Sequence, residues 1–281
     1  MAKKINRSGA GNVIGVLFLC VVACFMVLPM IYAVGNSFKP MDELFKFPPT
    51  LFPQRWVVTN YTDLFVLMGN SWVPFSRYFF NTIFITFTGT FGQIVFCSLC
   101  AYPLAMYNFP GSKFFTNLIK TALMFNGTVL WLPLFIIKAR LGMIDTYWAI
   151  IVPTFGAPMG MYLMRQFMSQ IPKSLVEAAR IDGAGSFKIF WSIVMPQVKS
   201  AWLTLMIFSV QGLWNLGASV FIQSESLKTL PYALNQIVST GIARQGVANA
   251  ITVIMMSVPI ITFIISQSNI IETMATSGMK D

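Results

Sequence analysis

The sequence lacks histidine altogether, although it is 281 residues long. Without an imidazole, serine–histidine triads and acid–base catalysis by histidine are excluded. Zinc sites that combine cysteine with histidine are excluded as well. No other pair of nucleophile and base stands out, and no cluster of metal ligands does. We therefore expect no catalytic residue and no metal site, and an enzyme is the least favoured class of function.

Charge is scarce as well. Only 10% of the residues are charged, whereas a soluble globular domain carries about 25%. Hydrophobic residues make up 56% of the chain, which indicates an integral membrane protein. A spanning helix needs about 20 mostly apolar residues. Six runs qualify, roughly Gly11–Gly35, Tyr78–Tyr107, Phe114–Ile137, Thr146–Leu163, Ala201–Ile222 and Gly246–Ile271.

The predicted fold class is therefore an all-α integral membrane protein with six transmembrane helices. The first run is too long for the apolar region of a cleaved signal peptide, so an uncleaved first span is favoured. Of the 19 Lys and Arg residues, eleven lie in segments that are cytoplasmic if the N-terminus is inside. Both termini are then cytoplasmic. The predicted organisation is a tail over residues 1–10, a six-span domain over 11–272 and a tail over 273–281.

Acidic residues are absent from all six predicted spans. Transporters coupled to protons or sodium usually carry buried ionisable residues or broken-helix ion sites in their spans. The dipeptide Gly-Lys does not occur, so the chain has no nucleotide-binding P-loop of its own. If the chain moves solutes uphill, the energy must come from another chain. A stand-alone channel or secondary carrier is the alternative, and uptake that needs no ATPase would favour it.

Cysteine is limited to four residues, all within apolar runs. Two of them, Cys97 and Cys100, have the spacing of a metal or redox pair, but no second pair accompanies them. We interpret all four as small residues that pack in the membrane, and we expect no disulfide. The four are Cys20, Cys24, Cys97 and Cys100.

Residues 36–77 are predicted to form a long outward-facing loop, which we call the external loop. It is rich in proline and aromatic residues. A loop of this length is usually either functional or disordered, and its aromatic content argues against disorder. Two interpretations remain open. The loop packs on the outer ends of the spans, or it docks a soluble partner.

Uncharged polar residues in the fifth predicted span suggest a solute pathway. Gln211 and Asn215 are four residues apart and therefore share one face of a helix. Trp214 lies beside them and could stack on a sugar ring. The alternative is that such side chains form hydrogen bonds between helices. We expect Gln211, Trp214 and Asn215 to line a pathway for a polar, uncharged solute.

Residues 171–199 stand out between two apolar runs because they are charged and broken by glycine. Ser174-Leu-Val-Glu177 has the pattern of a capping box and predicts a helix start. Gly183 and Gly185 predict the end of that helix, and Ser186 can cap a second short helix that ends before Pro196. The segment predicts an amphipathic helix–turn–helix on the cytoplasmic face. The alternative is a helix that rests on lipid.

This segment resembles the EAA loop found in the permease subunits of bacterial ABC importers. The family pattern is roughly E-A-A-x-x-D-G-A, then an aromatic and apolar run, then I-x-x-P. We call residues 171–199 the EAA loop. The matching residues are Glu177, Ala178, Ala179, Asp182, Gly183, Ala184, Phe190, Ile193 and Pro196.

The external loop resembles that of the carbohydrate-uptake branch of this family, through Asn36-Ser-Phe-Lys-Pro40-Met-Asp-Glu43. Asp145-Thr-Tyr-Trp148 is similar to that branch too. The resemblance covers the whole chain and implies a type I ABC importer permease fold like that of the shorter, six-span maltose-type permease. It implies a location in the bacterial cytoplasmic membrane. It also implies three kinds of partner: a second permease, a dimer of ATPase subunits and an extracytoplasmic substrate-binding protein.

In the family, the EAA loop couples the permease to the ATPase. The resemblance therefore implies that Glu177 makes a cap and a polar contact and that Gly183 forms the turn. It implies no cofactor in this chain, since ATP and Mg²⁺ bind to the partner ATPase. The expected function is that of a permease for a sugar or oligosaccharide. A permease for another solute class, for example peptides, is the alternative within the family.

Overall fold

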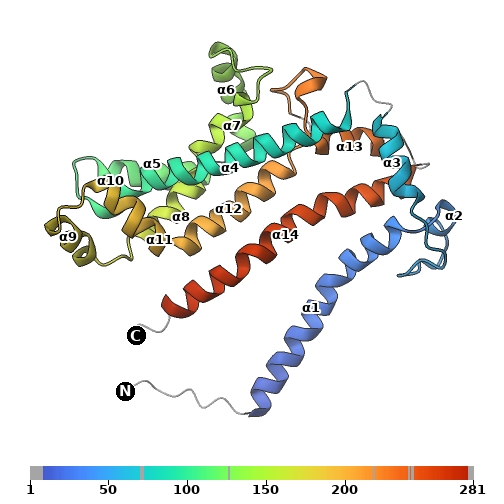
Figure 1. Ribbon diagram of the computed structural model, residues 1–281, viewed down its shortest axis with the longest axis horizontal. Helices are drawn as coiled ribbons and strands as arrows, with labels where there is room; N and C mark the ends of the chain where they lie inside the picture. Colours follow the sequence, from blue (N-terminus) through green and yellow to red (C-terminus); the bar gives the residue numbers. More distant parts are fainter. Residues whose placement is uncertain are drawn as a thin grey trace. The chain divides into compact units, whose positions relative to one another are not determined.

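The computed structural model describes residues 9–69, 73–125, 127–217, 219–239, 241 and 244–277 (Figure 1). Within these ranges every regular element is a helix, which confirms the predicted all-α class. The chain divides into two compact units. One contains Met1–Asn70 with Gln236–Met255, and the other contains Ser71–Asn235 with Met256–Asp281.

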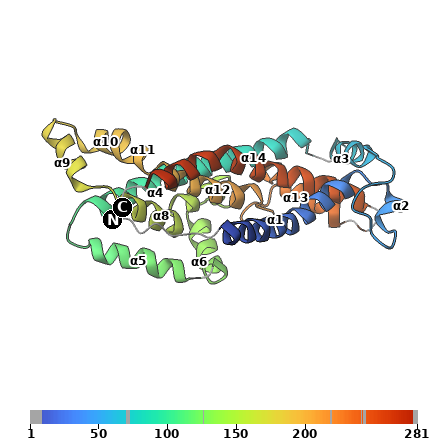
Figure 2. The ribbon, with the colours of Figure 1, turned by 90° about the horizontal axis from the view of Figure 1, so that it is seen from below.

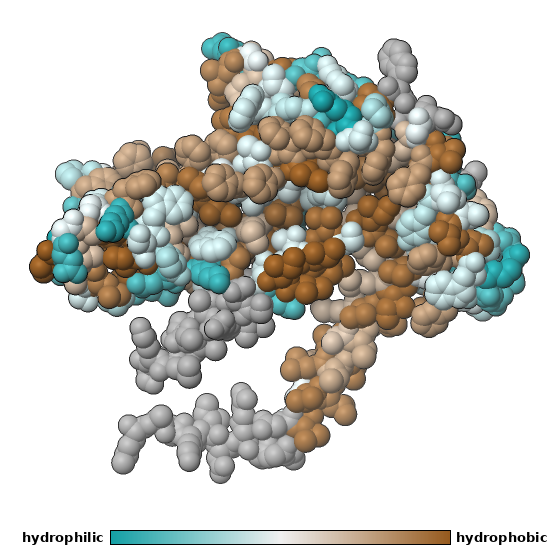
Figure 3. Space-filling view, in the orientation of Figure 1, coloured by the Kyte–Doolittle hydropathy of each residue, from teal (hydrophilic) through white to brown (hydrophobic). Residues whose placement is uncertain are grey.

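The first unit begins with α1, Gly9–Ser37, a helix of 29 residues. It carries no charged side chain along its whole length. In Figure 3 the coloured surface of this helix is almost entirely hydrophobic. Such a sequence forms a helix in lipid because the helix satisfies every backbone N–H and C=O within the segment.

The loop that follows α1 contains two short helices, α2 (Met41–Leu44) and α3 (Thr59–Gly69), and it folds around two buried charges. The ammonium group of Lys39 donates a hydrogen bond of 2.7 Å to Asn36 Oδ1 and another to the carbonyl of Thr50. The carboxylate of Glu43 accepts the backbone N–H groups of Gln54 and Arg55, both at 3.0 Å. A buried charge is tolerated when it is paired and hydrogen-bonded in this way.

Asn60 closes the same loop onto the end of α1. Its side-chain amide donates to the carbonyls of Ser37 and Lys39, both at 2.9 Å. A Cβ atom at Gly246 would lie 2.2 Å from the Asn60 amide oxygen, so a larger residue there would displace this hydrogen-bonded side chain. The external loop is thus a folded structure, as its aromatic content predicted. Docking of a partner on it stays a prediction.

The second unit is built around α4, Phe75–Met106, a helix of 32 residues. Three helices pack along it: α7 (Trp148–Phe155), α8 (Pro158–Met168) and α12 (Lys199–Trp214) (Figures 1 and 2). Close approach requires a small residue at Gly92, where a Cβ atom would lie 2.0 Å from the ring of Phe155. Small residues at helix contacts are typical of membrane proteins.

The remaining elements include α5 and α6, which follow α4, and a 3-10 helix that precedes α13. Both α13 and α14 continue from one unit into the other. Their bounds are Ser112–Met124 for α5, Gly127–Arg140 for α6, Glu225–Leu227 for the 3-10 helix, Leu230–Ser239 for α13 and Gln245–Ser277 for α14.

Three helices in the described part of the chain are long and apolar enough to cross a membrane: Val13–Ser37, Phe75–Met106 and Gln245–Gln267. They match the first, second and sixth predicted runs. Two bent helix pairs would raise the number to five. One is α5 with α6, and the other joins Ser186–Gln197 to α12 at an angle of 79°. Six spans and cytoplasmic termini stay predictions.

The predicted fourth run, Thr146–Leu163, forms two helices instead of one. The first, α7, ends at Phe155, and α8 starts at Pro158 after Gly156 and Ala157. Proline at the first position of a helix is favourable, whereas inside a helix it removes a hydrogen bond. Pro158 therefore begins a new helix.

The cysteines are all free, as expected from their positions in apolar runs. Cys97 is buried, and its thiol lies 3.5 Å from the carbonyl oxygen of Phe155 and 3.6 Å from that of Ala157. It therefore packs α4 against the break between α7 and α8.

Candidate functional site

The EAA loop begins with α9, Lys173–Ile181. One side of this helix is buried through Val176 and Ala179, while Glu177 and Ala178 are exposed. The segment is therefore amphipathic, as its sequence predicted. Figure 2 shows α9 beyond the ends of α4 and α8, with α10 and α11 leading back toward them.

The predicted capping box is wrong. The helix starts one residue before Ser174, the residue at the N-cap is Pro172, and no side chain caps the helix. Pro172 fixes its own φ angle and has no N–H to satisfy, so the chain can turn into the helix directly after it. Glu177 thus lies within the helix, and its carboxylate is directed to solvent rather than to the helix start.

The end of α9 is where glycine predicted it. Gly183 has φ +82°, a left-handed conformation that other residues rarely adopt. Its N–H donates to the carbonyl of Arg180 at 3.0 Å, and the N–H of Ala184 donates to that of Ala179 at 2.9 Å. These two bonds form a Schellman motif, which satisfies carbonyls that the helix end leaves free. Asp182 is the C-cap residue and is exposed.

The second half of the EAA loop is a helix in three pieces: α10 (Ser186–Ile189), a π-helix (Phe190–Val194) and α11 (Met195–Gln197). The predicted cap at Ser186 is wrong, because Gly185 precedes the helix and no side chain caps it. The Ser186 hydroxyl instead accepts a long hydrogen bond, 3.5 Å, from the Tyr107 hydroxyl.

The predicted stop before Pro196 is also wrong, since the helix continues through that residue. Pro196 occupies one of the first positions of α11, directly after the π-helix. Proline has no N–H to donate, so Pro196 removes one backbone hydrogen bond without ending the helix. The helix–turn–helix itself is confirmed.

A hydrophobic cluster fixes the EAA loop on the second unit. Phe190 is 1% exposed, and its ring centroid lies 5.3 Å from that of Tyr102 in α4. Side chains from α4, α8, α9, α10, the π-helix and α12 contribute to this single cluster. It includes Cys97, Ala101, Tyr102, Met164, Met168, Val176, Ala179, Ile189, Phe190, Val194, Ala201 and Leu205. The loop is therefore held as part of the helical body.

The outward side of the loop combines free charge with apolar surface. Within the part of the chain that the structure describes, neither Glu177 nor Asp182 makes an ion pair or a side-chain hydrogen bond. Two large apolar side chains, Ile181 and Phe187, are 87% and 71% exposed. Unpaired carboxylates beside exposed apolar groups are typical of a surface that binds another protein.

The three predicted pathway residues do not share one surface. Gln211 and Asn215 are both exposed at the end of α12, and the Asn215 amide donates to the Gln211 carbonyl at 2.9 Å. Trp214 is buried, 3% exposed, and lines an apolar groove of about 330 Å³ with residues of α4, α12 and α14 such as Thr86 and Thr262. The structure thus separates the tryptophan from the amide pair.

A polar cluster that sequence reasoning missed ties the chain after α12 to α4. Asp145, with φ +60°, accepts the backbone N–H groups of Gln223 and Ser224 at 3.0 and 2.8 Å, and also the Ser224 hydroxyl. These hydrogen bonds hold the pKa of Asp145 below its usual value. The bond from the Ser224 hydroxyl has the largest effect. The only sequence signal for this cluster was the motif Asp145-Thr-Tyr-Trp148, and the motif did not indicate which residues Asp145 would bind.

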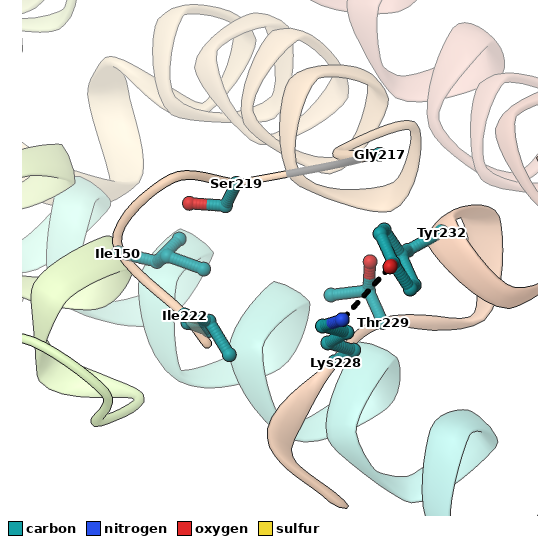
Figure 4. Close-up of a pocket in the computed structure, with 7 residues that line it drawn as sticks. All are labelled: Ile150, Gly217, Ser219, Ile222, Lys228, Thr229 and Tyr232. Carbon is teal, nitrogen blue, oxygen red and sulfur yellow. Dashed lines mark hydrogen bonds between the residues drawn. The ribbon is translucent and has the colours of Figure 1, made fainter. Parts of the chain in front are cut away.

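Asn81 in α4 extends this cluster. Its amide donates to the carbonyls of Ser226 and Lys228 at 2.9 and 2.8 Å, and its oxygen accepts the Tyr147 hydroxyl at 2.7 Å. Figure 4 shows Lys228 reaching the Tyr232 hydroxyl beside a small cavity of about 10 Å³. Such a cavity holds about one water molecule, so it is too small for a sugar.

The described residues contain no group of three or more acidic or cysteine side chains that could hold a metal ion.

Comparison with known proteins identifies the family. The model of the family described as "Binding-protein-dependent transport system inner membrane component" matches residues 93–272, which include the whole EAA loop. The chain belongs to this family. The predicted family resemblance and the predicted location in the cytoplasmic, or inner, membrane are confirmed.

The chain is 31% identical over 271 residues to the arabinooligosaccharides transport system permease protein AraQ of Halalkalibacterium halodurans, and the match covers 95% of each chain. It is 30% identical to the inner membrane ABC transporter permease protein YcjP of Escherichia coli, covering 94% of this chain and 95% of that one.

A chain of a bacterial ABC transporter involved in the import of the acidic polysaccharide alginate has a similar structure. The TM-score is 0.79, with 24% identity over 93% of this chain and 98% of that chain. This likeness confirms the predicted importer permease fold.

Proposed function

We propose that the chain is the permease subunit of an ATP-driven importer that takes up a sugar or an oligosaccharide. The observation that carries this proposal is the EAA loop: a helix ended by Gly183, fixed on the helical body by Phe190, with Glu177 and Asp182 unpaired and exposed. Membership of a binding-protein-dependent transport family and the similarity to AraQ support it.

The EAA loop would seat in a cleft of a separate ATPase subunit. Its Schellman motif and its hydrophobic cluster make the loop rigid, and a rigid element transmits a displacement. The residues that would contact or shape this seat are Glu177, Ala178, Ala179, Asp182, Gly183, Phe190 and Pro196. ATP and Mg²⁺ would bind to the ATPase, and closure of the ATPase dimer would move the loop.

The solute pathway would lie between this chain and a second permease. Gln211 and Asn215 present neutral amide groups on an exposed helix face, which suits a polar, uncharged solute. Trp214 would shape the pathway from behind this face, because it is buried. Solute would be delivered by an extracytoplasmic binding protein.

The test is gentle purification of the chain from its native membrane, with its partners identified by mass spectrometry. We expect a second permease and a P-loop ATPase to accompany it, and ATP-dependent uptake of labelled oligosaccharides after reconstitution. Recovery of the chain alone, still able to move solute without ATPase, would establish a carrier or channel instead. Uptake of peptides rather than sugars by the complete complex would correct the solute class.

A further inference from the structure

The C-terminal end of α4 meets the EAA loop through a small polar and aromatic contact. Tyr102, in the last turns of α4, is buried against Phe190 of the loop, with ring centroids 5.3 Å apart. Its hydroxyl lies 3.3 Å from that of Tyr107, the residue that ends α4. The two rings meet edge to face, with centroids 5.6 Å apart.

Tyr107 in turn touches the loop on both sides of its glycine turn. The guanidinium of Arg180, on α9, lies over the Tyr107 ring at 5.0 Å from the centroid. The Tyr107 hydroxyl lies 3.5 Å from the Ser186 hydroxyl, on α10. The residue directly after α4 therefore contacts the helix before Gly183 and the helix after it.

The last turn of α4, which leads directly into Tyr107, contains a proline. Pro103 lies inside α4, so the helix loses one i to i−4 hydrogen bond there. The N–H of Tyr107 donates to the Pro103 carbonyl at 3.1 Å, and this bond closes the helical turn that follows the proline. Prolines inside spanning helices are common points of bending.

We infer that Arg180 and Tyr107 are positioning residues that link the EAA loop to α4, so that displacement of the loop moves the end of this helix. The inference rests on the proposed function, since it assigns the route by which that function's loop acts. Neither residue would touch solute or nucleotide.

The contact differs from the hydrophobic cluster beneath it. The buried side chains of the cluster hold the fold, so their replacement would destabilise the chain. Arg180 is exposed and lies outside the cluster, so it can be changed while the cluster remains. Tyr107 is half-buried and packs against the edge of the cluster, and leucine at this position keeps an apolar side chain there. A stacked cation–aromatic pair at an exposed site is weak enough to be broken and reformed.

The test uses the complete complex in lipid nanodiscs, with its native binding protein purified together with the solute it carries. The readout is the ATPase rate with the loaded binding protein divided by the basal rate, per assembled complex. For Arg180→Gln and Tyr107→Leu we expect this ratio to fall about two- to fivefold, as expected for loss of one cation–π contact. Arg180→Lys should retain part of the ratio, and Tyr107→Phe most of it.

Two matched variants serve as controls. Lys113→Gln removes one exposed positive charge from the start of α5, and Tyr162→Phe removes a hydroxyl from α8; both should keep the wild-type ratio. The double variant of Arg180→Gln with Tyr107→Leu should be no worse than either single change, because the two residues act through one contact.

The outcomes separate the two proposals. A stimulated wild-type complex whose ratio is unchanged by Arg180→Gln and Tyr107→Leu would overturn this inference and leave the proposed function standing. A wild-type complex that does not form, or that the binding protein does not stimulate, would overturn the proposed function and this inference with it.

Discussion

The EAA loop and the external loop differ in what they do with charge. The external loop buries Lys39 and Glu43 and gives each of them hydrogen-bond partners within the loop. The EAA loop buries only apolar side chains and leaves Glu177 and Asp182 exposed. Both segments are punctuated by proline and glycine and both connect apolar helices, so composition alone does not distinguish them.

The difference indicates which loop is a scaffold and which is a contact surface. A buried ion with two or more hydrogen bonds contributes to one defined conformation, and burial makes it inaccessible to a partner. An exposed carboxylate on a rigid helix contributes little to folding, and its hydrogen-bonding capacity is available to a second protein. The same residue type, glutamate, thus has opposite roles at positions 43 and 177.

The largest expected effect is that of Gly183→Val. Valine is β-branched and would be forced into φ +82°, at a cost of about 1–2 kcal/mol or more. The turn would then open and the EAA loop would lose its shape. We expect uptake to fall about tenfold or more, measured as ATP-dependent transport per assembled complex.

Gly185→Val is the matched control for this change. Gly185 has φ −67° and ψ 156°, an extended conformation that valine prefers, and no atom lies within 4 Å of its would-be Cβ. Its uptake should stay near the wild-type level. Full uptake by Gly183→Val would remove the turn from the mechanism.

Glu43→Gln and Glu177→Gln test the comparison directly. Glutamine at position 43 would present an amide N–H₂ to one of two backbone donors, which should cost about 2 kcal/mol of stability. At position 177 the change should alter stability by less than about 0.5 kcal/mol, while the ATPase dissociates more readily. Unfolding midpoints in detergent and the amount of ATPase retained during purification measure the two effects.

A loss of stability in Glu177→Gln and a loss of ATPase in Glu43→Gln would contradict the division into scaffold and contact surface. Asp42→Asn is the control for the external loop, because Asp42 neighbours Glu43 in sequence but pairs with Arg55 at an exposed position. That exposed pair should contribute little.

The sequence predicted the long helices well and the local connections less well. Three continuous apolar runs appear as α1, α4 and α14 because burial in lipid overrides weaker local preferences. The helix stop at Gly183 was predictable because glycine adopts a positive φ angle at far lower cost than most other residues. The start of α9 was misplaced because Pro172, rather than the side chain of Ser174, sets it. Proline also divided the predicted fourth run at Pro158.

The polar cluster around Asp145 lay beyond sequence reasoning for a different reason. Asp145 binds Ser224, 79 residues away along the chain, and Tyr147 binds Asn81, 66 residues away. Pairings of this length follow from how α4, α7 and the chain after α12 pack together, and no periodicity encodes them. The same limit concealed the contact of Tyr107 with Arg180 and Ser186.

The smallest expected effect concerns pH and Asp145, a charged residue that lies between the two loop types because it is hydrogen-bonded yet partly exposed. Its pKa is lowered, first by the Ser224 hydroxyl and then by the backbone N–H of Ser224. A lowered pKa means that the stabilisation is fully present above the unfolded value of about 3.9 and is lost as pH falls through the folded value.

Asp145→Asn should therefore lower the unfolding midpoint by about 2 °C at pH 6, and the difference from wild type should shrink as pH falls below about 4. The midpoint of both proteins in detergent, followed from pH 6 to pH 3, measures this. A difference of zero over that whole range would mean that the charge of Asp145 contributes nothing and that the amide serves equally well. Hydrogen bonds without a charge would then be enough to hold Ser224, so Asp145 would differ from the buried charges of the external loop, whose ionised form the scaffold needs.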